Sequence, residues 1–436
     1  MSPTESLTDL SVRDAADAIN RRSITSLALV EACLARIREL DPKVQAWAHV
    51  DADGALAAAR ERDAESAAGR VRGALHGVPV GIKDIIDVAG LPTTAGARAF
   101  AHTRPTRDAT VVARLRAAGA VIVGKAHTTQ FAYRDPAPTR NPWNHAHTPG
   151  GSSSGSAAAV AIRMVPTALG SQTVGSILRP AAYCGVVGLK GPHGLVPVDG
   201  IVPLGWSLDH IGPFARSVAD TAVVLGVMAG RQIVPTGASA PRLAVPRQLF
   251  ERADAGLRQH LEGVVQRLAG AGAKVSEVTL PPEFAEIHAA GQVILESEAA
   301  AYHQGMFAKY AADYGPGMAA MLPIGLARPA VEYVVAHRAR VAFREAMIPL
   351  LEAHDALLSP TALGPAPAGL TWTGDASLCA PWSSAGVPSI SIPTGLDPTG
   401  LPLALQLIQA PSGLERLLGV AAWCEGVVAF TARPGA

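Results

Sequence analysis

The sequence predicts a layered α/β protein, and three observations support this fold class. Short apolar runs with strand-like patterns alternate with segments of helical spacing along most of the chain. Hydrophobic residues make up 49% of the 436 residues, which is enough for a large buried core. Finally, 43 glycines and 34 prolines interrupt the chain often, as in proteins built from many short elements.

The predicted elements follow from this patterning. Residues 7 to about 65 have helical spacing, begin with a capping-box-like sequence at Ser11, and are expected to cover one face of the core. Alternating β-branched residues between glycines predict a buried strand within residues 76–87. Residues 207–213 are predicted to form a loop. The other predicted helices span residues 110–119, 156–164, 217–228, 255–269, 284–310, 330–354 and 414–425, and the other strands span residues 120–124, 243–245, 274–280, 356–358, 389–393 and 403–408.

Charge and cysteine usage exclude several classes of function. The formal net charge is +1, from 37 basic and 36 acidic residues, so nothing favours nucleic acid or an anionic membrane as a partner. The four cysteines lie far apart without a Cys-x-x-Cys pair, and His145 and His147 have no acidic or cysteine cluster beside them. We therefore expect no metal, no cofactor and no disulfide framework. The first residues lack the features of a signal peptide, so a cytoplasmic protein is expected.

Lys83 is the first candidate for chemistry, because it lies inside the apolar run of the predicted strand. A lysine in an apolar strand is costly unless it is paired or deprotonated, and burial lowers the lysine pKa toward that of a general base. The alternative is a lysine that extends to solvent at the strand end, beside Asp84 and Asp87. The strand pattern alone leaves both interpretations open.

Two turns of small residues, at 150–156 and 170–176, place serine hydroxyls beside backbone N–H groups at predicted helix starts. Such positions stabilise developing negative charge, which indicates serine-based catalysis. A flexible linker is disfavoured because alanine-rich helical sequence follows the first turn. Neither phosphate-loop motif is present at either turn. The Gly-x-Ser-x-Gly elbow is absent around Ser176; residues 151–155 fit it formally, but a Pro/Asn-rich loop precedes them instead of a strand.

Taken together in this order, the motifs closely resemble the amidase signature family over nearly the whole chain. The resemblance rests on Gly-Ile-Lys-Asp at 81–84, Gly-Gly-Ser-Ser-Ser-Gly-Ser-Ala at 150–157, Gly-Ser-Gln-Thr-x-Gly-Ser at 170–176, and the segments 207–217, 385–388 and 400–407. It implies a single domain over residues 1–436 with a large mixed central β-sheet covered on both faces by helices. Within it we expect an N-terminal helical cover (1–70), a catalytic core (75–230), a variable helical region that sets specificity (240–355), and strands with a final helix that return to the core (356–436).

The same resemblance implies the catalytic residues. Ser176 corresponds to the nucleophile, Ser152 to the bridging serine and Lys83 to the base, and the Gly151–Ser152 peptide bond is expected to be cis. A neutral lysine would accept a proton through the bridging hydroxyl while the nucleophile attacks the carbonyl carbon. The oxyanion hole is expected to consist of the backbone N–H groups of Thr173, Val174, Gly175 and Ser176.

Two positions depart from the common family pattern and bear on the substrate. Gln172 stands where many members have Asp, and Arg179 lies three residues after the nucleophile rather than two. This pair is similar to the malonamidase-like subgroup, in which the arginine binds a substrate carboxylate. We therefore expect Arg179 and Gln172 to be substrate-binding residues, with a structural Arg179, bonded to loop carbonyls, as the alternative.

The predicted function is hydrolysis of the C–N bond of small amides, malonamate-like or otherwise polar and linear. Within the same chemistry, a urethanase (carbamate hydrolase) or an aryl-acylamide hydrolase with esterase side activity is the alternative. From another class, an amidotransferase-type subunit that requires protein and tRNA partners competes with both. The expected partner is a small-molecule amide or carbamate, with no nucleic acid and no membrane, and a homodimer stays open.

Overall fold

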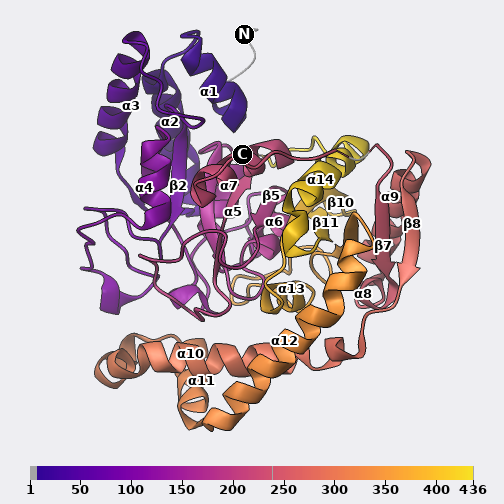
Figure 1. Cartoon of the computed structure of the whole chain (residues 1–436). Helices are drawn as coiled ribbons and strands as arrows, with labels where there is room; N and C mark the ends of the chain where they lie inside the picture. Colours follow the sequence, from indigo (N-terminus) through magenta and orange to yellow (C-terminus); the bar gives the residue numbers. More distant parts are fainter. Residues whose placement is uncertain (1–6, 238, 436) are drawn as a thin grey trace.

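In the part of the chain that the structure describes, eleven strands form one continuous sheet (Figure 1). The computed structural model describes residues 7–237 and 239–435. The strand order is β1-β3-β2-β4-β6-β5-β10-β11-β9-β7-β8. The strands are β1 (Trp47–Val50), β2 (Pro79–Lys83), β3 (Val121–Ala126), β4 (Thr167–Gln172), β5 (Val187–Lys190), β6 (His210–Ala215), β7 (Arg242–Pro246), β8 (Lys274–Val278), β9 (Ala356–Pro360), β10 (Ser389–Leu396) and β11 (Pro402–Ile408).

The sheet is mixed, as the family resemblance implied. Strands β3, β2 and β4 are parallel neighbours, and so are β9, β7 and β8 at the other end. The central strands from β4 to β9 pair antiparallel. Two parallel α/β portions are thus joined through an antiparallel centre, and the second serine turn begins in β4, which pairs with both kinds of neighbour.

Helices cover the sheet, and alternation along the strands shows the two buried faces. In β3, Val121 and Val123 pack in one apolar cluster while Ile122 packs in another, and in β4 Ala168 and Leu169 divide in the same way. A buried strand sends successive side chains to opposite faces, so both faces are covered. The helices are α1 (Val12–Asn20), α2 (Ser26–Val44), α3 (Ala52–Ala67), α4 (Thr110–Ala117), α5 (Ser154–Ala161), α6 (Leu178–Cys184), α7 (Val218–Ala229), α8 (Arg247–Phe250), α9 (Ala255–Gly270), α10 (Ile287–Tyr310), α11 (Pro316–Ala327), α12 (Ala330–Glu352), α13 (Ala380–Ser384) and α14 (Leu414–Val428).

Helices α10, α11 and α12 form a helical arm below the sheet in Figure 1, where α10 packs against both of the other two. Helices α10 and α11 pack closely at Gly325, where a Cβ would lie 2.0 Å from the Glu296 carbonyl oxygen. Within the described residues, no single helix is long and apolar enough to span a membrane. Helices α11 and α12 pass that test only as a pair, by length and composition, and they bend by 103° at their junction.

Two sequence-based predictions were wrong in part. The helical N-terminal region contains a strand, β1, which pairs antiparallel with β3 at the sheet edge. The predicted loop at 207–213 includes the start of β6. The prediction was wrong there because Gly212 and Pro213 are typical turn residues, but in this protein they lie inside the strand. A Cβ on Gly212 would lie 2.0 Å from the Leu189 carbonyl oxygen. Glycine is therefore required here because the β5 backbone comes close to β6, and not because the chain turns.

Candidate active site

Lys83 is the last residue of β2, and its side chain is fully buried. Its Nζ atom lies 2.6 Å from Oγ of Ser152 and 2.8 Å from Oγ of Ser171. The pKa of Lys83 is held well below its usual value, chiefly by burial and further by the positive charge of Arg179, while the charge of Asp209 raises it. The alternative interpretation, in which Lys83 extends to solvent, is therefore wrong. This site holds a lysine with a strong tendency to be neutral, hydrogen-bonded to two serine hydroxyls.

Asp84, one of the two acidic residues that follow Lys83 in the sequence, pairs with a different lysine. It forms a buried ion pair with Lys125 at 3.0 Å, and both side chains are at most 1% exposed. The Thr94 backbone N–H also donates to the Asp84 carboxylate at 3.2 Å. This pair neutralises a carboxylate next to Lys83 in sequence, so the Lys83 amine keeps only hydroxyl partners.

Ser152 is held by bonds to the backbone on either side of it. The Gly151–Ser152 peptide bond is cis, which confirms the conformation expected from the family resemblance. The Gly151 carbonyl accepts hydrogen bonds from Arg179, and the Ser152 carbonyl accepts one from the Thr129 N–H at 3.1 Å. These contacts fix the main chain that carries the Ser152 hydroxyl toward Lys83.

Ser176 lies at the end of a turn that we call the 173–176 turn, between β4 and α6. Ser176 is 7% exposed, and its carbonyl accepts from the Ser153 N–H at 3.4 Å, which places the two serine turns against each other. Within the described residues, the backbone N–H groups of Val174, Gly175 and Ser176 have no acceptor. Unpaired N–H groups at one turn are what an oxyanion hole requires.

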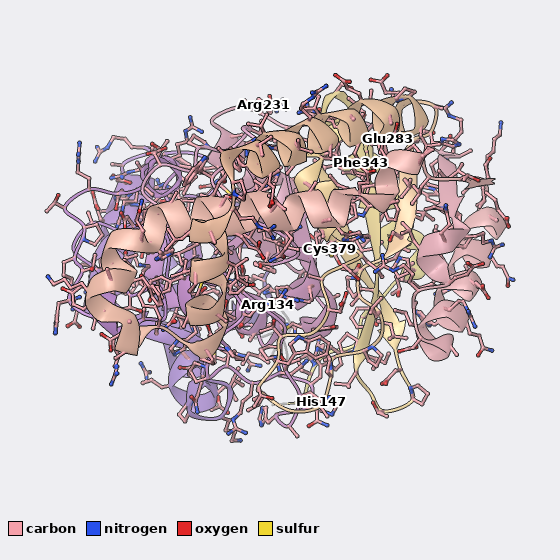
Figure 2. The ribbon with its side chains drawn as sticks, turned by 90° about the horizontal axis from the view of Figure 1, so that it is seen from below. Arg134, His147, Arg231, Glu283, Phe343 and Cys379 are labelled. Carbon is pink, nitrogen blue, oxygen red and sulfur yellow. The ribbon has the colours of Figure 1, made fainter. Side chains whose placement is uncertain are left out.

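Contacts from three directions hold the 173–176 turn. The Thr173 hydroxyl donates to Oδ1 of Asp209 at 2.6 Å, and the Ser383 hydroxyl donates to the Val174 carbonyl at 2.7 Å. A Cβ on Gly175 would lie 2.9 Å from the Ala376 side chain and 3.1 Å from that of Cys379, so glycine is needed where this segment approaches the turn. Cys379 is labelled in Figure 2, which views this region past the helical arm.

Gln172, predicted to bind substrate, is fully buried and bonded within the protein. Its Oε1 atom accepts from the N–H groups of Ile177 and Leu178 at 2.8 and 2.9 Å, and its Nε2 donates to Ser383 at 2.9 Å. The amide oxygen therefore satisfies two donors at the start of α6, directly after Ser176, the predicted nucleophile. This geometry favours a structural role over direct contact with a substrate.

Arg179 is 7% exposed and is bonded to loop carbonyls, the alternative considered from the sequence. Its Nε and Nη2 donate to the Gly151 carbonyl at 3.2 and 2.7 Å, and its Nη1 donates to the Gly374 carbonyl. These bonds use three of the five guanidinium N–H groups. Within the described residues no carboxylate pairs with Arg179, so its positive charge is not neutralised by an ion pair.

Three residues of this site were missed by the sequence analysis. Ser171 is a second hydroxyl partner of Lys83, and Asp209 and Ser383 support the turn. Ser171 lies in the recognised motif at residues 170–176, so its place in that motif was a usable signal. Asp209 lies in the recognised segment 207–217, but its partner Thr173 is 36 residues away, and Ser383 lies 209 residues from Val174. No local pattern identifies such distant partners.

Comparisons with known proteins agree with this geometry. The Amidase family model matches residues 28–418. A curated relative, one of the subunits of the glutamyl-tRNA(Gln) amidotransferase of Chloroflexus aurantiacus, is 43% identical over 296 residues, which cover 62% of this chain and 61% of that relative. Among solved structures, an amidase superposes with a TM-score of 0.90 at 32% identity, covering 96% of this chain and 99% of its own. The peptide amidase of Stenotrophomonas maltophilia superposes with a TM-score of 0.84 at 31% identity, covering 98% of each chain. The chain therefore belongs to the amidase signature family.

Proposed function

We propose that this protein hydrolyses the C–N bond of small linear amides, with Ser176 as nucleophile, Ser152 as bridging serine and Lys83 as base. The observation that carries the proposal is the contact between a fully buried lysine amine and the Ser152 hydroxyl at 2.6 Å. A neutral amine in this position can accept the Ser152 proton on its lone pair while an N–H donates to Ser171. Burial, the main cause of the lowered Lys83 pKa, favours the neutral form of the amine.

The proposed reaction has two halves. In the first, Ser176 Oγ attacks the amide carbon as its proton moves to Ser152 Oγ and the Ser152 proton moves to Lys83 Nζ. The carbonyl oxygen becomes an oxyanion that accepts from the N–H groups of the 173–176 turn. The relay then returns a proton to the nitrogen, so that an amine leaves and an acyl-Ser176 ester remains. In the second half, water gives a proton to the same relay, attacks the ester carbon, and releases the acid and Ser176.

The substrate proposal rests on Arg179. Two of its guanidinium N–H groups have no partner among the described residues, and its charge lies close enough to Lys83 to lower the lysine pKa. A substrate carboxylate would neutralise this buried cation and accept hydrogen bonds from its remaining N–H groups. Another strongly polar acyl group would accept the same hydrogen bonds. Malonamate-like amides have this chemistry, and Gln172 would contribute only by holding the start of α6.

Carbamates and aryl acylamides are the alternative substrates for the same three residues. A carbamate presents a similarly resonance-stabilised carbonyl, and an ester presents a more reactive one, so both fit the proposed relay. An amidotransferase-type role, with protein and tRNA partners, is the second candidate function, and the amidotransferase relative described above favours it. The two candidates differ in what the isolated chain can do, because an amidase needs no partner.

A substrate panel tests the proposal. The purified chain is assayed alone on malonamate, a neutral aryl amide, an aryl carbamate and an ester, beside Ser176→Ala. Turnover of at least one amide by the wild type, and none by the variant, is the expected result. Absence of all turnover by the isolated chain, with activity appearing only after the other amidotransferase components are added, would favour the second candidate. Retention of amide turnover by Ser176→Ala would refute the proposed nucleophile.

A further inference from the structure

Glu298 is a buried carboxylate in the helical arm that no step of the proposed reaction uses. It lies on α10 and is 1% exposed. Within the described residues, no lysine or arginine forms an ion pair with it, and its nearest basic group is Nε2 of His337 at 3.8 Å. The pKa of that histidine is lowered, first by burial and then by Arg340, so it has little positive charge near neutral pH. An acidic side chain in this setting is costly unless hydrogen bonds satisfy it.

The hydrogen bonds of Glu298 connect the arm to a loop at the active site. Its Oε1 accepts from the Tyr333 hydroxyl on α12 at 2.8 Å. Its Oε2 accepts from the Ser207 backbone N–H at 2.9 Å. Ser207 belongs to the segment of residues 204–209, which we call the 204–209 loop, and this loop leads into β6. This carboxylate of α10 thus bonds to α12 and to a loop of the predicted catalytic core.

The 204–209 loop in turn holds the 173–176 turn. Asp209 is 4% exposed, and its Oδ2 accepts from the N–H groups of Leu204 and Gly205 at 3.0 and 3.2 Å. Its Oδ1 accepts from the Thr173 hydroxyl at 2.6 Å. The loop is also tied internally, since the Asp209 N–H donates to the Gly205 carbonyl at 2.8 Å. A shift of this loop therefore changes the acceptor on which Thr173 depends.

Glu298 also lies next to the turn in space. A Cβ on Gly205 would be 3.5 Å from Glu298 Oε2 and 3.5 Å from Thr173 Cγ2. The carboxylate and the first residue of the turn therefore both border the space beside Gly205. Loss of the Ser207 bond would therefore act on the backbone adjoining Thr173.

We infer that Glu298 is a positioning residue: by holding the Ser207 N–H it fixes the 204–209 loop, and through Asp209 it fixes the 173–176 turn on which the oxyanion forms. This inference rests on the proposed function, because it assigns a role to Glu298 in aligning the proposed oxyanion hole. It also gives the helical arm a catalytic contribution, since two of its helices supply Glu298 and Tyr333. Figure 2 shows the arm helices lying across this side of the molecule.

The test measures how fast a fluorophosphonate probe labels Ser176, which needs no known substrate. In this reaction the Ser176 Oγ–P bond forms, the P–F bond breaks, fluoride leaves, the serine proton passes to the relay, and the phosphoryl oxygen takes the oxyanion position. We expect Glu298→Ala to lower the maximal labelling rate about tenfold with little change in probe affinity, less than the roughly 10²- to 10³-fold loss from removing an oxyanion donor. Glu298→Gln is expected to stay within about threefold of wild type, because its amide oxygen can still accept from Ser207.

Glu296→Ala is the matched control. Glu296 lies two residues earlier on α10 and is 6% exposed. It accepts from Arg328 at 2.6 Å and from Gln292 at 2.8 Å, and neither bond involves the 204–209 loop. Its removal disturbs the arm to a similar degree, so its labelling rate should stay near that of wild type. If Glu298→Ala does not fold, Glu298→Asp keeps the charge, withdraws the carboxylate by one methylene, and is expected to show the same slow labelling.

The possible outcomes separate the role inferred for Glu298 from the proposed function. Equal losses in the Glu296 and Glu298 variants, or no loss in a folded Glu298→Ala, would overturn the inference while leaving the nucleophile in place. A wild-type protein that is not labelled at Ser176 would overturn the proposed function, and the role of Glu298 with it.

Discussion

The Lys83 amine and the Ser152 hydroxyl are 2.6 Å apart in a fully buried position. No acidic side chain among the described residues bonds to this amine, whose other partner is the Ser171 hydroxyl. Nearby Asp84 is instead neutralised by Lys125. A lysine without a bonded counter-ion, in a site that disfavours its charge, is suited to accept a proton and not to balance a negative charge.

Replacing Lys83 with Met is expected to lower kcat/KM for any turned-over amide by roughly 10²- to 10⁴-fold, because the proton acceptor is lost. The thermal stability of the variant should be at least that of wild type, since the cost of burying an amine disappears. Initial rates and thermal unfolding measured on the same preparation check both statements. A variant that keeps more than a tenth of wild-type kcat/KM would show that another group accepts the proton.

The stability difference between Lys83→Met and wild type should also depend on pH. The folded-state pKa of Lys83 lies below its ordinary value near 10.5, so in the interval between them the unfolded chain binds more protons than the folded one. The free energy of unfolding of wild type therefore rises with pH through this interval, and Lys83→Met lacks that rise. Denaturant unfolding from pH 6 to 10 should show the advantage of the variant shrinking as pH increases. A constant difference would contradict the lowered pKa.

Arg179→Leu should impair malonamate-like substrates more than neutral amides or carbamates. The activity of the variant on both classes of substrate is expected to fall somewhat, because Arg179 also holds the Gly151 carbonyl next to Ser152. The additional loss on the anionic substrate should appear as a higher KM, since a carboxylate would lose its buried cation. Comparison of kcat and KM on one anionic and one neutral amide measures this difference. Equal losses on both would assign Arg179 a purely structural role.

Gln172→Ala should destabilise the protein by about 1–3 kcal/mol, because it leaves the buried N–H groups of Ile177 and Leu178 without their acceptor. Gln304→Ala on α10 is the control: its side chain is exposed and donates only to the Ala301 carbonyl at 3.2 Å, so a change within about 0.5 kcal/mol is expected. Denaturant unfolding of both variants compares the two. A Gln172→Ala protein as stable as the control would argue against the structural role.

The sequence predicted the elements whose signals are local. The strand around Lys83 and the helices after the serine turns follow from residue spacing and small-residue composition, and the structure has them as β2, α5 and α6. The start of β6 was missed because Gly212 and Pro213 are turn formers, whereas Gly212 lies in a strand to admit the Leu189 carbonyl. A glycine required for close approach and a glycine required for a turn are identical in sequence.

The residues of the candidate site also fall into those with a local sequence signal and those without one. Lys83, Ser152 and Ser176 were found because each lies in a short motif of the family. Asp209 and Glu298 were not assigned a role, because the roles proposed for them depend on contacts with Thr173 and Ser207, residues 36 and 91 positions away in the chain. Their contacts depend on how the arm and the 204–209 loop pack, and this packing has no local sequence pattern.

Trapping the acyl-enzyme tests the central claim most directly. Wild-type protein is mixed with an activated ester, quenched in acid during turnover, digested and mapped by mass spectrometry, with Ser176→Ala treated in parallel. The account predicts one acyl group, on Ser176, in the wild type and none at that position in the variant. An acyl group on another residue, or turnover of the ester by wild type without any acyl-Ser176, would contradict it.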